Sequence, residues 1–364
     1  MESTNGKSTD RRWKHPRKRD AEIVLLCNPR AGGRWKELAK ILDSDEAAHV
    51  RRIVTDSVED IAPAVATLGK GSGLVCTYGG DGTIQRIIDH LLDNENHSSE
   101  TILALLGGGT MNVTSRWLGF GKSPSNNFRH VVNGYRTGNL LIKEVPLMKI
   151  KVGDRLHHGF TFGIGPIVRI LDAYERGKKG KVAAVQIGVQ SALAALFNMG
   201  SMVDQLESME GRVTLDGEVL EHETFSAIFT NVTGQINPGI EPFISERTRD
   251  SFYAAAYSVS AREFATALPF IARGLLPIDL GEMLKKWGRG KISEPLSTDP
   301  RYINRPSHTM VIETDEPIYT VDGEILDKPP GPIEITIGPT LKLAVGPQST
   351  FSQTVEAAKN VIRG

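Results

Sequence analysis

The 364-residue sequence has few cysteines, no excess of charge of either sign and no long uninterrupted hydrophobic run. Its two cysteines, Cys27 and Cys76, each end an apolar stretch, so neither a disulfide framework nor a cysteine-rich zinc site is expected. A reducing cytoplasm is therefore the predicted location. Lys plus Arg and Asp plus Glu both number 43, which argues against nucleic acid as a partner. The longest apolar stretch, residues 182–203, contains polar residues and predicts a buried or interfacial helix, not a transmembrane span.

The pattern of apolar residues divides the chain into four parts. Residues 1–20 hold seven Lys or Arg against three acids, which predicts a disordered basic tail and leaves a weak membrane-surface role open. In residues 21–143, short apolar strands alternate with amphipathic helical segments, the pattern of an α/β domain with a parallel sheet. Residues 144–346 predict a mostly antiparallel, β-rich second domain, and residues 347–364 predict a C-terminal helix that returns to the first domain. Helices are also expected within the second domain, over residues 182–202 and 261–284.

Three glycine-rich turns follow predicted strands, at residues 28–33 (NPRAGG), 79–83 (GGDGT) and 107–112 (GGGTMN). Because the carboxyl ends of parallel strands lie at one edge of a sheet, we expect the turns to converge there. Glycine has no Cβ to block close approach, so N–H groups of such turns, and of a following helix, can face an anion. Tight strand–helix geometry explains any one of these turns, but three at one edge favour a phosphate site. The two common nucleotide fingerprints, G-x-x-x-x-G-K-[ST] and G-x-G-x-x-G after the first strand, are absent.

These turns, together with the later sequence YTVDGEIL from Tyr319, resemble the diacylglycerol kinase catalytic family, which includes bacterial lipid kinases, sphingosine kinases and ceramide kinases. The resemblance implies an α/β nucleotide domain, a β-sandwich second domain and an ATP site in the cleft between them. It also implies an ATP- and Mg²⁺-dependent lipid kinase whose substrate is a diacylglycerol-like or long-chain-base lipid. Such an enzyme would be cytoplasmic and peripheral to the membrane surface; whether it is a homodimer stays open.

The same resemblance implies which residues line the nucleotide. They come from the three turns and from the end of the predicted second strand: Asn28, Pro29, Arg30, Ala31, Gly32, Thr55, Gly79, Gly80, Asp81, Gly82, Thr83, Ile84, Gln85 and Thr110. Asp81 would orient the phosphate end of the nucleotide, directly or through Mg²⁺. The glycines would leave room for the phosphates.

Phosphoryl transfer to an alcohol needs a group that takes the hydroxyl proton. Asp322 and Glu324 are two residues apart, so on an extended strand both side chains face the same way. The resemblance to bacterial lipid kinases implies Glu324 as the base, with Asp322 assisting or binding metal, whereas in sphingosine kinases the aspartate that matches Asp81 is more often given this role. Asp-Gly is also a strong hairpin signal, and a plain hairpin is the expected reading of the similar stretch at residues 216–218.

A further metal site is implied by the segment SERTRDSF at residues 245–252. In the family, the matching segment holds a structural Mg²⁺ by one aspartate and backbone carbonyls, which here correspond to Asp250 and the carbonyls of Arg247 and Phe252. Ser251 stands where the family usually has glycine. An exposed loop aspartate without metal explains Asp250 equally well.

Two departures from the family pattern keep other functions open. Arg86 stands where a glutamate is usual, one helical turn after the phosphate loop, and Val113 replaces a common aspartate. A catalytically impaired nucleotide- or lipid-binding regulatory protein is therefore one alternative. A NAD kinase-like enzyme is another, because NAD kinases share GGDG, although the early NPRAGG motif and the extended β-rich domain argue against it.

Overall fold

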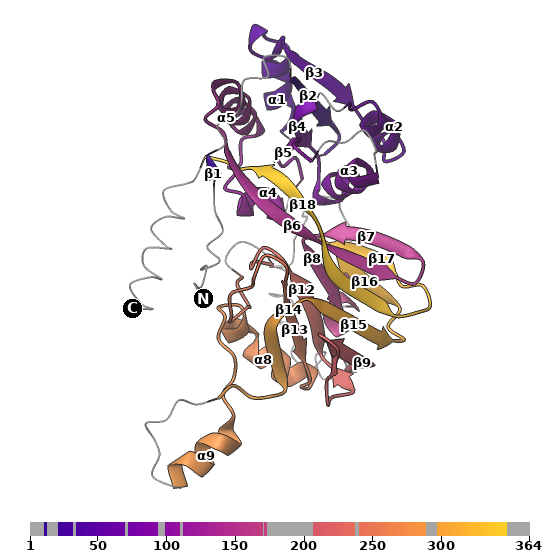
Figure 1. The fold of residues 1–364 in the computed structure, drawn as a ribbon, viewed down its shortest axis with the longest axis vertical. Helices are drawn as coiled ribbons and strands as arrows, with labels where there is room; N and C mark the ends of the chain where they lie inside the picture. Colours follow the sequence, from indigo (N-terminus) through magenta and orange to yellow (C-terminus); the bar gives the residue numbers. More distant parts are fainter. Residues whose placement is uncertain are drawn as a thin grey trace, which may run out of the picture. The chain divides into compact units, whose positions relative to one another are not determined.

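The computed structural model describes ten segments of the chain, residues 11–12, 21–31, 34–69, 72–93, 99–109, 112–169, 171–172, 207–236, 240–288 and 297–347 (Figure 1). The helix predicted over residues 182–202 lies outside the described residues, and so does the helix predicted over residues 347–364 apart from Pro347. The chain divides into two compact units. We call the described part of Lys7–Val145 and Thr340–Gly364 the α/β unit, and that of Pro146–Pro339 the β-rich unit.

The sheet of the α/β unit is parallel, as predicted. Its strands, in spatial order, are β3 (Val50–Val54), β2 (Glu22–Cys27), β4 (Ser72–Tyr78) and β5 (Ile102–Leu105). The end of β18 (Ile333–Ala344) continues this order, because Lys342 and Leu343 pair in parallel with Ile102 and Leu103 of β5. The start of β6 (Leu141–Val152) pairs with the short strand β1 (Arg11–Arg12).

Helices cover the sheet of the α/β unit on two sides (Figure 1). They are α1 (Trp35–Leu42), the 3₁₀ turn η1 (Asp45–Ala47), α2 (Ile61–Ala66), α3 (Asp81–Asp93), α4 (Val113–Trp117) and α5 (Pro124–Thr137). Helix α1 packs against α5, and α2 packs against α3. The apolar spacing explains this packing for α1, which buries Leu38, Ile41 and Leu42. Helix α5 begins after Ser123, whose hydroxyl accepts a hydrogen bond from the backbone N–H of residue 126, and ends at Gly138 with φ 70°.

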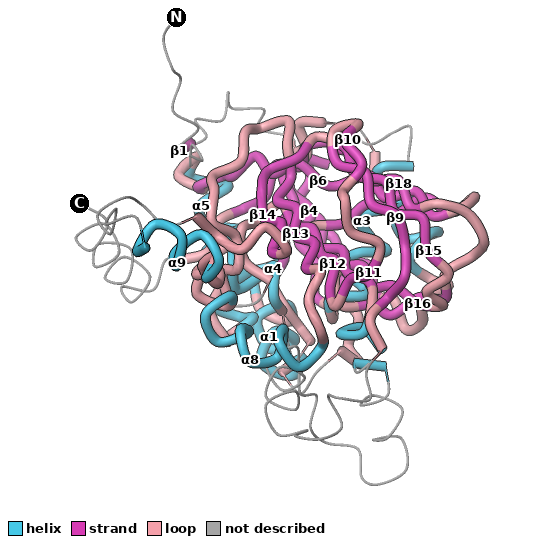
Figure 2. Tube along the Cα trace, turned by 90° about the horizontal axis from the view of Figure 1, so that it is seen from below, coloured by secondary structure: helices cyan, strands magenta, loops and turns pink. Residues whose placement is uncertain are grey.

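The β-rich unit is a sandwich of antiparallel sheets (Figures 1 and 2). One sheet has the order β14 (Tyr302–Ser307), β13 (Phe252–Tyr257), β12 (Ala227–Asn231), β8 (Thr161–Ile164), β16 (Ile318–Val321) and β17 (Glu324–Asp327). The facing strands are β7 (Arg155–Gly159), β9 (Met209–Leu215), β10 (Glu218–Val219), β11 (Thr224–Phe225) and β15 (Thr309–Thr314). Strand β9 pairs with β10, β11 and β15. Strand β7 pairs with β6, and β15 pairs with β18 as well. Side chains meet between the sheets: the hydroxyl of Thr230 lies 3.1 Å from the sulfur of Met148.

The helix predicted over residues 261–284 is two helices, which corrects the expectation from the sequence. Helix α8 (Ala261–Ile271) begins at the cap residue Ser260, and α9 (Leu280–Gly288) follows after a break. Gly274 has φ 71° in this break, a left-handed conformation that ends a helix. Within the described residues, no helix is long and apolar enough to cross a bilayer.

Candidate functional site

The glycine-rich turns converge at the carboxyl edge of the parallel sheet, as the sequence predicts. The N–H of Asn28, which follows β2, donates to the carbonyl of Tyr78 at the end of β4, with an N···O distance of 2.8 Å. The N–H groups of Gly108 and Gly109 donate to the carbonyl of Gly79 at 2.7 and 3.1 Å. Direct backbone hydrogen bonds thus hold the three turns together.

The first turn is shaped by Asn28. Its side-chain oxygen accepts a hydrogen bond from the N–H of Arg30 at 2.9 Å, and its carbonyl accepts from the N–H of Ala31 at 3.1 Å. This side-chain turn directs the chain from β2 toward α1 while leaving Arg30 exposed. Asn28, Pro29, Arg30 and Ala31 are therefore brought to the sheet edge, whereas Gly32 lies outside the described residues.

Thr55 reaches the same edge from β3 but is turned toward the sheet. Its N–H and its hydroxyl both donate to the carbonyl of Cys27, at 2.9 and 3.3 Å, and the residue is 2 % exposed. These bonds give Thr55 a structural role at the end of β3. Its predicted contact with a nucleotide stays a prediction, as does that of Thr110, which is outside the described residues.

The second turn leads directly into α3. The N–H of Ile84 donates to the carbonyl of Gly80 at 3.0 Å, so the first N–H groups of the helix, from Asp81 to Thr83, have no intrahelical partner. The positive end of the helix dipole lies there as well. A Cβ on Gly79 would come within 2.6 Å of Thr83, whereas the nearest atom to a Cβ on Gly80 is 3.9 Å away. This helix start therefore presents N–H donors beside a glycine at which a Cβ would make only an ordinary van der Waals contact.

Two residues predicted to line the nucleotide are buried under that helix start. Ile84 and Gln85 are both 4 % exposed. The side-chain oxygen of Gln85 is buried and has no hydrogen-bond partner among the described atoms, and the same holds for the hydroxyl of Tyr78. An unpaired buried polar group costs about 1–3 kcal/mol. At this edge of the sheet, the Gln85 oxygen can therefore accept a hydrogen bond from water or a ligand, and the Tyr78 hydroxyl can donate or accept one.

The third turn depends on a residue that sequence analysis did not select. Asn112 has φ 47°, and its side-chain N–H donates to the carbonyl of Gly109 at 2.6 Å. Its own carbonyl accepts the N–H of Arg116 at 2.9 Å, so the residue closes the turn and opens α4. Gly107, with φ 70°, lies against the side chains of Asn112 and Ser115. The quoted motif GGGTMN contains the signal, since asparagine adopts this conformation more readily than most residues.

Arg86, which stands where the family usually has glutamate, is exposed on α3. An acidic residue, Glu59, lies close enough for its pKa to respond to the charge of Arg86. Backbone and Ser57 hydrogen bonds hold the pKa of Glu59 below its ordinary value, and the positive charge of Arg86 adds to this. Arg86 thus has an anionic neighbour within the protein.

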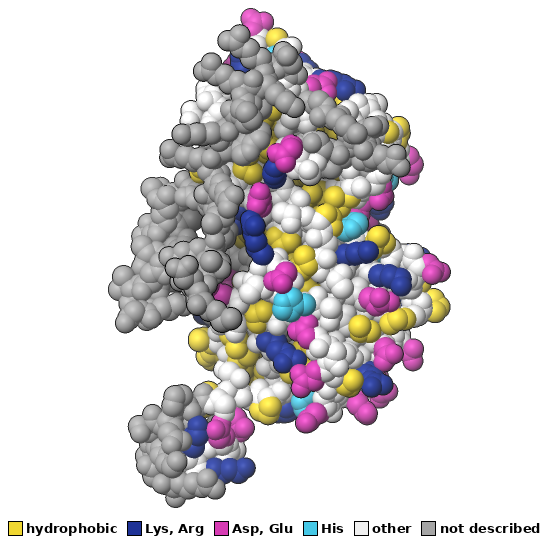
Figure 3. All heavy atoms as spheres, in the orientation of Figure 1, with side chains coloured by type: hydrophobic (Ala, Val, Ile, Leu, Met, Phe, Trp, Pro, Cys, Tyr) yellow, Lys and Arg dark blue, Asp and Glu magenta, His cyan; other side chains and the backbone are white. Residues whose placement is uncertain are grey.

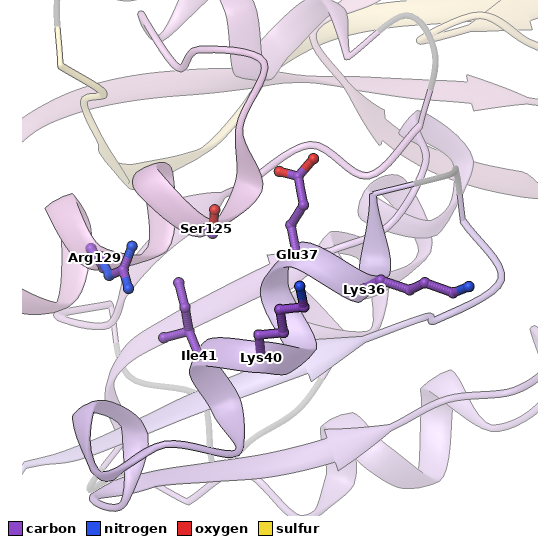
Figure 4. Close-up of a pocket in the computed structure, with 6 residues that line it drawn as sticks. All are labelled: Lys36, Glu37, Lys40, Ile41, Ser125 and Arg129. Carbon is purple, nitrogen blue, oxygen red and sulfur yellow. The ribbon is translucent and has the colours of Figure 1, made fainter.

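The described part of the chain contains a shallow cavity of about 300 Å³ between α1 and α5 (Figure 4). Its lining is Lys36, Glu37, Lys40, Ile41, Ser125 and Arg129. Arg129 makes two hydrogen bonds to the carboxylate of Glu46, at 2.7 and 3.0 Å. None of the residues predicted to hold a nucleotide lines this cavity, so it is separate from the glycine-rich turns.

The Asp-Gly-Glu stretch in the β-rich unit is a two-residue hairpin. Val321 of β16 pairs with Glu324 of β17, and Asp322 and Gly323 have φ 49° and 89°. One carboxylate oxygen of Asp322 accepts the backbone N–H groups of residues 160 and 161, at 2.9 and 2.8 Å. The carboxylate thereby fixes the hairpin to the start of β8. Its assisting or metal-binding role stays a prediction beside this structural one.

The similar stretch at residues 216–218 has the same construction. Leu215 pairs with Glu218, and Asp216 and Gly217 have φ 52° and 83°. One carboxylate oxygen of Asp216 accepts the N–H groups of residues 308 and 309, at 2.7 and 2.9 Å. The two hairpins therefore share both the turn type and the anchoring carboxylate. The hairpin at Asp216 can serve as a matched control for the hairpin at Asp322.

Glu324, the predicted base, lies partly buried on β17 beside a tyrosine–histidine pair. The hydroxyl of Tyr319 and Nε2 of His157 are 2.8 Å apart, and Tyr319 is fully buried. Burial raises the pKa of Tyr319, the charge of Arg155 opposes this rise, and the Glu324 carboxylate adds to it. Sequence analysis did not select Tyr319 or His157; the tyrosine opens the quoted motif YTVDGEIL.

The segment predicted to hold a structural Mg²⁺ contains a guanidinium among its carbonyls. Nε of Arg247 donates to the carbonyl of Val232 at 2.8 Å, and Nη1 donates to the carbonyls of Thr248 and Ser251 at 2.9 and 3.1 Å. Within the described residues there is no group of three or more His, Cys, Asp or Glu side chains placed to hold a metal. The carbonyls of Arg247 and Phe252 are not among the acceptors of the guanidinium, so their metal-binding role, like that of Asp250, stays a prediction.

The comparisons with known proteins agree with this architecture. Residues 22–141 match the family model of the diacylglycerol kinase catalytic domain. A search of curated proteins found no match.

Solved structures of kinases share the fold of this chain. A diacylglycerol kinase from Bacillus anthracis strain Sterne is 18% identical, with a TM-score of 0.57, and the match covers 90% of this chain and 97% of that one. Another protein of that strain, proposed to be a diacylglycerol kinase, is 20% identical, with a TM-score of 0.60 and coverage of 90% and 98%. Yeast NADH kinase, complexed with NADH, is 12% identical, with a TM-score of 0.50 and coverage of 97% and 94%.

Proposed function

We propose that the protein is an ATP- and Mg²⁺-dependent lipid kinase that phosphorylates a hydroxyl of a diacylglycerol-like or long-chain-base lipid. The observation that carries this proposal is the convergence of three glycine-rich turns at the start of α3, within the stretch that matches the diacylglycerol kinase catalytic domain. Gly80, where a Cβ would meet no close neighbour among the described atoms, and the N–H groups of the first helical turn, which lack intrahelical partners, fit the phosphates of ATP. Bound Mg·ATP would supply the transferable phosphoryl group and the neutralising charge.

Each part of this edge has a defined task in the proposal. The N–H groups of Gly82 and Thr83 bind phosphate oxygens, and Asp81 orients the phosphate end of the nucleotide. Asn28 holds the first turn against β4, so that the turns keep their mutual position when the nucleotide arrives. Such preorganised donors stabilise developing charge without having to rearrange.

Glu324 is the proposed base that takes the proton of the lipid hydroxyl. The two-residue turn and the Asp322 anchor fix the start of β17, and the buried Tyr319 holds its hydroxyl toward His157. A carboxylate on a rigid strand can accept a proton in a defined direction. Such a base typically contributes about 10²–10⁴-fold to a rate.

Exposed apolar side chains near the two helices of the β-rich unit support a lipid substrate. Phe270 at the end of α8 is 59% exposed, and Leu284 of α9 is 61% exposed. Leu275 and Ile278, in the segment between these helices, are exposed as well. Exposed apolar side chains that form one patch mark contact with lipid or protein. We propose that this surface, together with peripheral binding, brings the enzyme to the bilayer.

The test is transfer of ³²P from Mg·ATP to diacylglycerol, monoacylglycerol, sphingosine, ceramide, phosphatidylglycerol and NAD. A labelled lipid is the expected product. Glu324→Gln should lower kcat by at least about 100-fold, while Glu218→Gln, in the matched hairpin, should not. Label on NAD would replace the lipid kinase with a NAD kinase-like enzyme. ATP binding without transfer to any acceptor would instead support the impaired regulatory protein that Arg86 and Val113 leave open.

A further inference from the structure

Every second residue of β7 contacts the hairpin that β16 and β17 form. Nη1 of Arg155 donates to the carbonyl of Asp327, the last residue of β17, at 3.0 Å. Nε2 of His157 lies 2.8 Å from the hydroxyl of Tyr319 on β16. A Cβ on Gly159 would meet a side chain of β16 at 2.5 Å. One face of β7 therefore lies against the hairpin, since alternate residues of a strand share a face.

Glu324 lies on the face of the hairpin that β7 contacts. It is the cross-strand partner of Val321, whose side chain is the nearest to the Cβ position of Gly159. Directly opposed residues of an antiparallel pair have their side chains on the same face, so Glu324 and Val321 both face β7. Tyr319, two residues before Val321, is on this face as well and is a diagonal neighbour of Glu324. The position of the Glu324 carboxylate therefore depends on how β7 holds the hairpin.

The surroundings of Tyr319 indicate which group donates in its hydrogen bond to His157. Tyr319 is fully buried, and burial raises its pKa, so the hydroxyl keeps its proton; the nearby charge of Arg155 opposes this rise. The positive guanidinium attracts the hydroxyl oxygen and directs the hydroxyl proton to Nε2 of His157. Nε2 accepts that proton only in the neutral imidazole that carries its hydrogen on Nδ1.

Three strands place charged or titratable groups on the side of His157 that faces the hairpin. These groups are Arg155 of β7, Tyr319 of β16 and Glu324 of β17. On β6, the residue opposite His157 is the buried and uncharged Ile150. A proton on Nε2 would remove the acceptor of the Tyr319 hydroxyl and would add a second positive charge beside Arg155. The imidazolium would also be attracted by the Glu324 carboxylate.

We propose that neutral His157 is a positioning residue for the base Glu324. By accepting the Tyr319 hydroxyl at Nε2, it holds the hairpin against β7, and its protonation loosens the hairpin and slows phosphoryl transfer. This inference rests on the proposed lipid kinase function, in which Glu324 takes the hydroxyl proton. Histidine ordinarily titrates near about pH 6.5, roughly two units above carboxyl side chains, so the two causes of lost activity at low pH are separable.

The pH dependence of kcat tests the inference, with the lipid that the natural protein phosphorylates as substrate. The kcat of the natural protein should fall below about pH 6.5. His157→Gln keeps a side-chain acceptor that cannot be protonated, so it should shift this fall to lower pH by at least about one unit. His158→Gln is the matched control, because adjacent residues of a strand point to opposite faces, and it should keep the kcat and the pH profile of the natural protein.

Removal of either partner of the hydrogen bond should misplace the base. His157→Phe and Tyr319→Phe should each lower kcat at pH 8 by about 10- to 100-fold with little change in the KM for ATP. The double variant should lose no more than either single variant, because both remove the same bond. His157→Gln should recover most of the kcat that His157→Phe loses.

Measurements that do not need activity separate the failure of this inference from that of the proposed function. Amide hydrogen exchange of residues 324–327 should be faster in His157→Phe than in the natural protein, and ¹⁵N NMR at pH 8 should show the ring proton of His157 on Nδ1. An unchanged pH profile in His157→Gln, or an unchanged kcat in His157→Phe while Glu324→Gln lowers it, would overturn the inference alone. Absence of transfer to any acceptor would overturn the proposed function. Unchanged exchange, or a ring proton on Nε2, would overturn the role of His157 whether or not the protein is a kinase.

Discussion

The glycines at the carboxyl edge of the parallel sheet differ in whether the fold could accommodate a Cβ at their positions. A Cβ on Gly79 would meet Thr83 at 2.6 Å, and one on Gly108 would meet the ring of Tyr78 at 2.9 Å. The fold itself therefore requires these two glycines. Gly80 has no such neighbour, since the nearest atom to its Cβ position is 3.9 Å away. A Cβ at Gly80 would make only an ordinary van der Waals contact, so the described part of the fold does not by itself require glycine there.

This contrast gives a prediction at the level of single residues. Gly80→Ala should leave the Tm unchanged but weaken ATP binding by about tenfold or more, which corresponds to about 1.4 kcal/mol. Gly108→Ala should lower the stability by about 1–3 kcal/mol through overpacking against Tyr78. Titration calorimetry with ATP and thermal unfolding of both variants provide the measurements. Unchanged ATP affinity in Gly80→Ala would remove the phosphates from this turn.

At the scale of elements, the two Asp-Gly hairpins allow structure and chemistry to be separated. Asp322→Asn and Asp216→Asn both keep a residue that tolerates positive φ but remove the charge that strengthens the bonds to backbone N–H groups. Each should lose about 1 kcal/mol in urea unfolding. If Asp322→Asn abolished phosphate transfer at full stability, Asp322 would have a chemical role that the anchoring bonds do not explain.

The hairpin at Asp216 also has a predicted pH dependence. Burial disfavours its ionised form, but hydrogen bonds from the N–H groups of Thr309 and His308 outweigh this and hold the pKa below its ordinary value. The stabilisation is therefore present above about pH 4, the ordinary pKa of aspartate, and is lost as the pH falls through the lower folded value. Urea unfolding between pH 6 and pH 3 should show this loss, and Asp216→Asn should reduce it. An equal pH dependence in both proteins would contradict the assignment.

Elements with local sequence signals could be predicted, whereas contacts between residues far apart in the sequence could not. Strand β4 and the turn at Gly79 could be predicted because an apolar run and the glycines after it are local signals. The bonds of Asp322 could not, since they reach residues 160 and 161, far back in the chain. Strands β7 and β8 are short and lack clear alternation, so only their pairing partners reveal them. Likewise, nothing local in the segment around Arg247 shows that a carbonyl of Val232 lies within reach.

Strands β2 and β4 each bury a cysteine, and this predicts how the thiols react. Burial raises the pKa of Cys27 to about 11 and that of Cys76 to about 12. Both thiols should be almost inert to a disulfide reagent at pH 8 in the native protein and should react fully in denaturant, because the thiolate is the nucleophile. The contribution of these raised pKa values to the free energy of unfolding is fully present below about pH 8.5, the ordinary pKa of cysteine. It is lost as the pH rises toward the pKa values of the folded protein. Rapid reaction of either thiol in the native state would contradict its burial.

At the scale of the whole molecule, the α/β unit is not continuous in sequence. Leu343 of β18 pairs with Leu103 of β5, and the N–H of Val345 donates to the carbonyl of Leu141 at 2.9 Å. Nε2 of His130 lies 3.2 Å from the carbonyl of Val345. The family match ends at residue 141, so it does not include this strand. The fold of the α/β unit therefore includes chain from both sides of the β-rich unit.

A fragment of residues 21–145 should consequently fail to fold stably. Leu341, Leu343 and Val345 are buried, and each such side chain contributes roughly 1.5–3 kcal/mol, so their loss approaches the whole stability of a domain, about 5–15 kcal/mol. The exposed edge of β5 would also favour aggregation. Joining residues 340–347 to this fragment through a flexible linker should restore a cooperative thermal transition in circular dichroism. A cooperative transition in the fragment without that strand would show that the parallel sheet needs only the four strands that precede the β-rich unit.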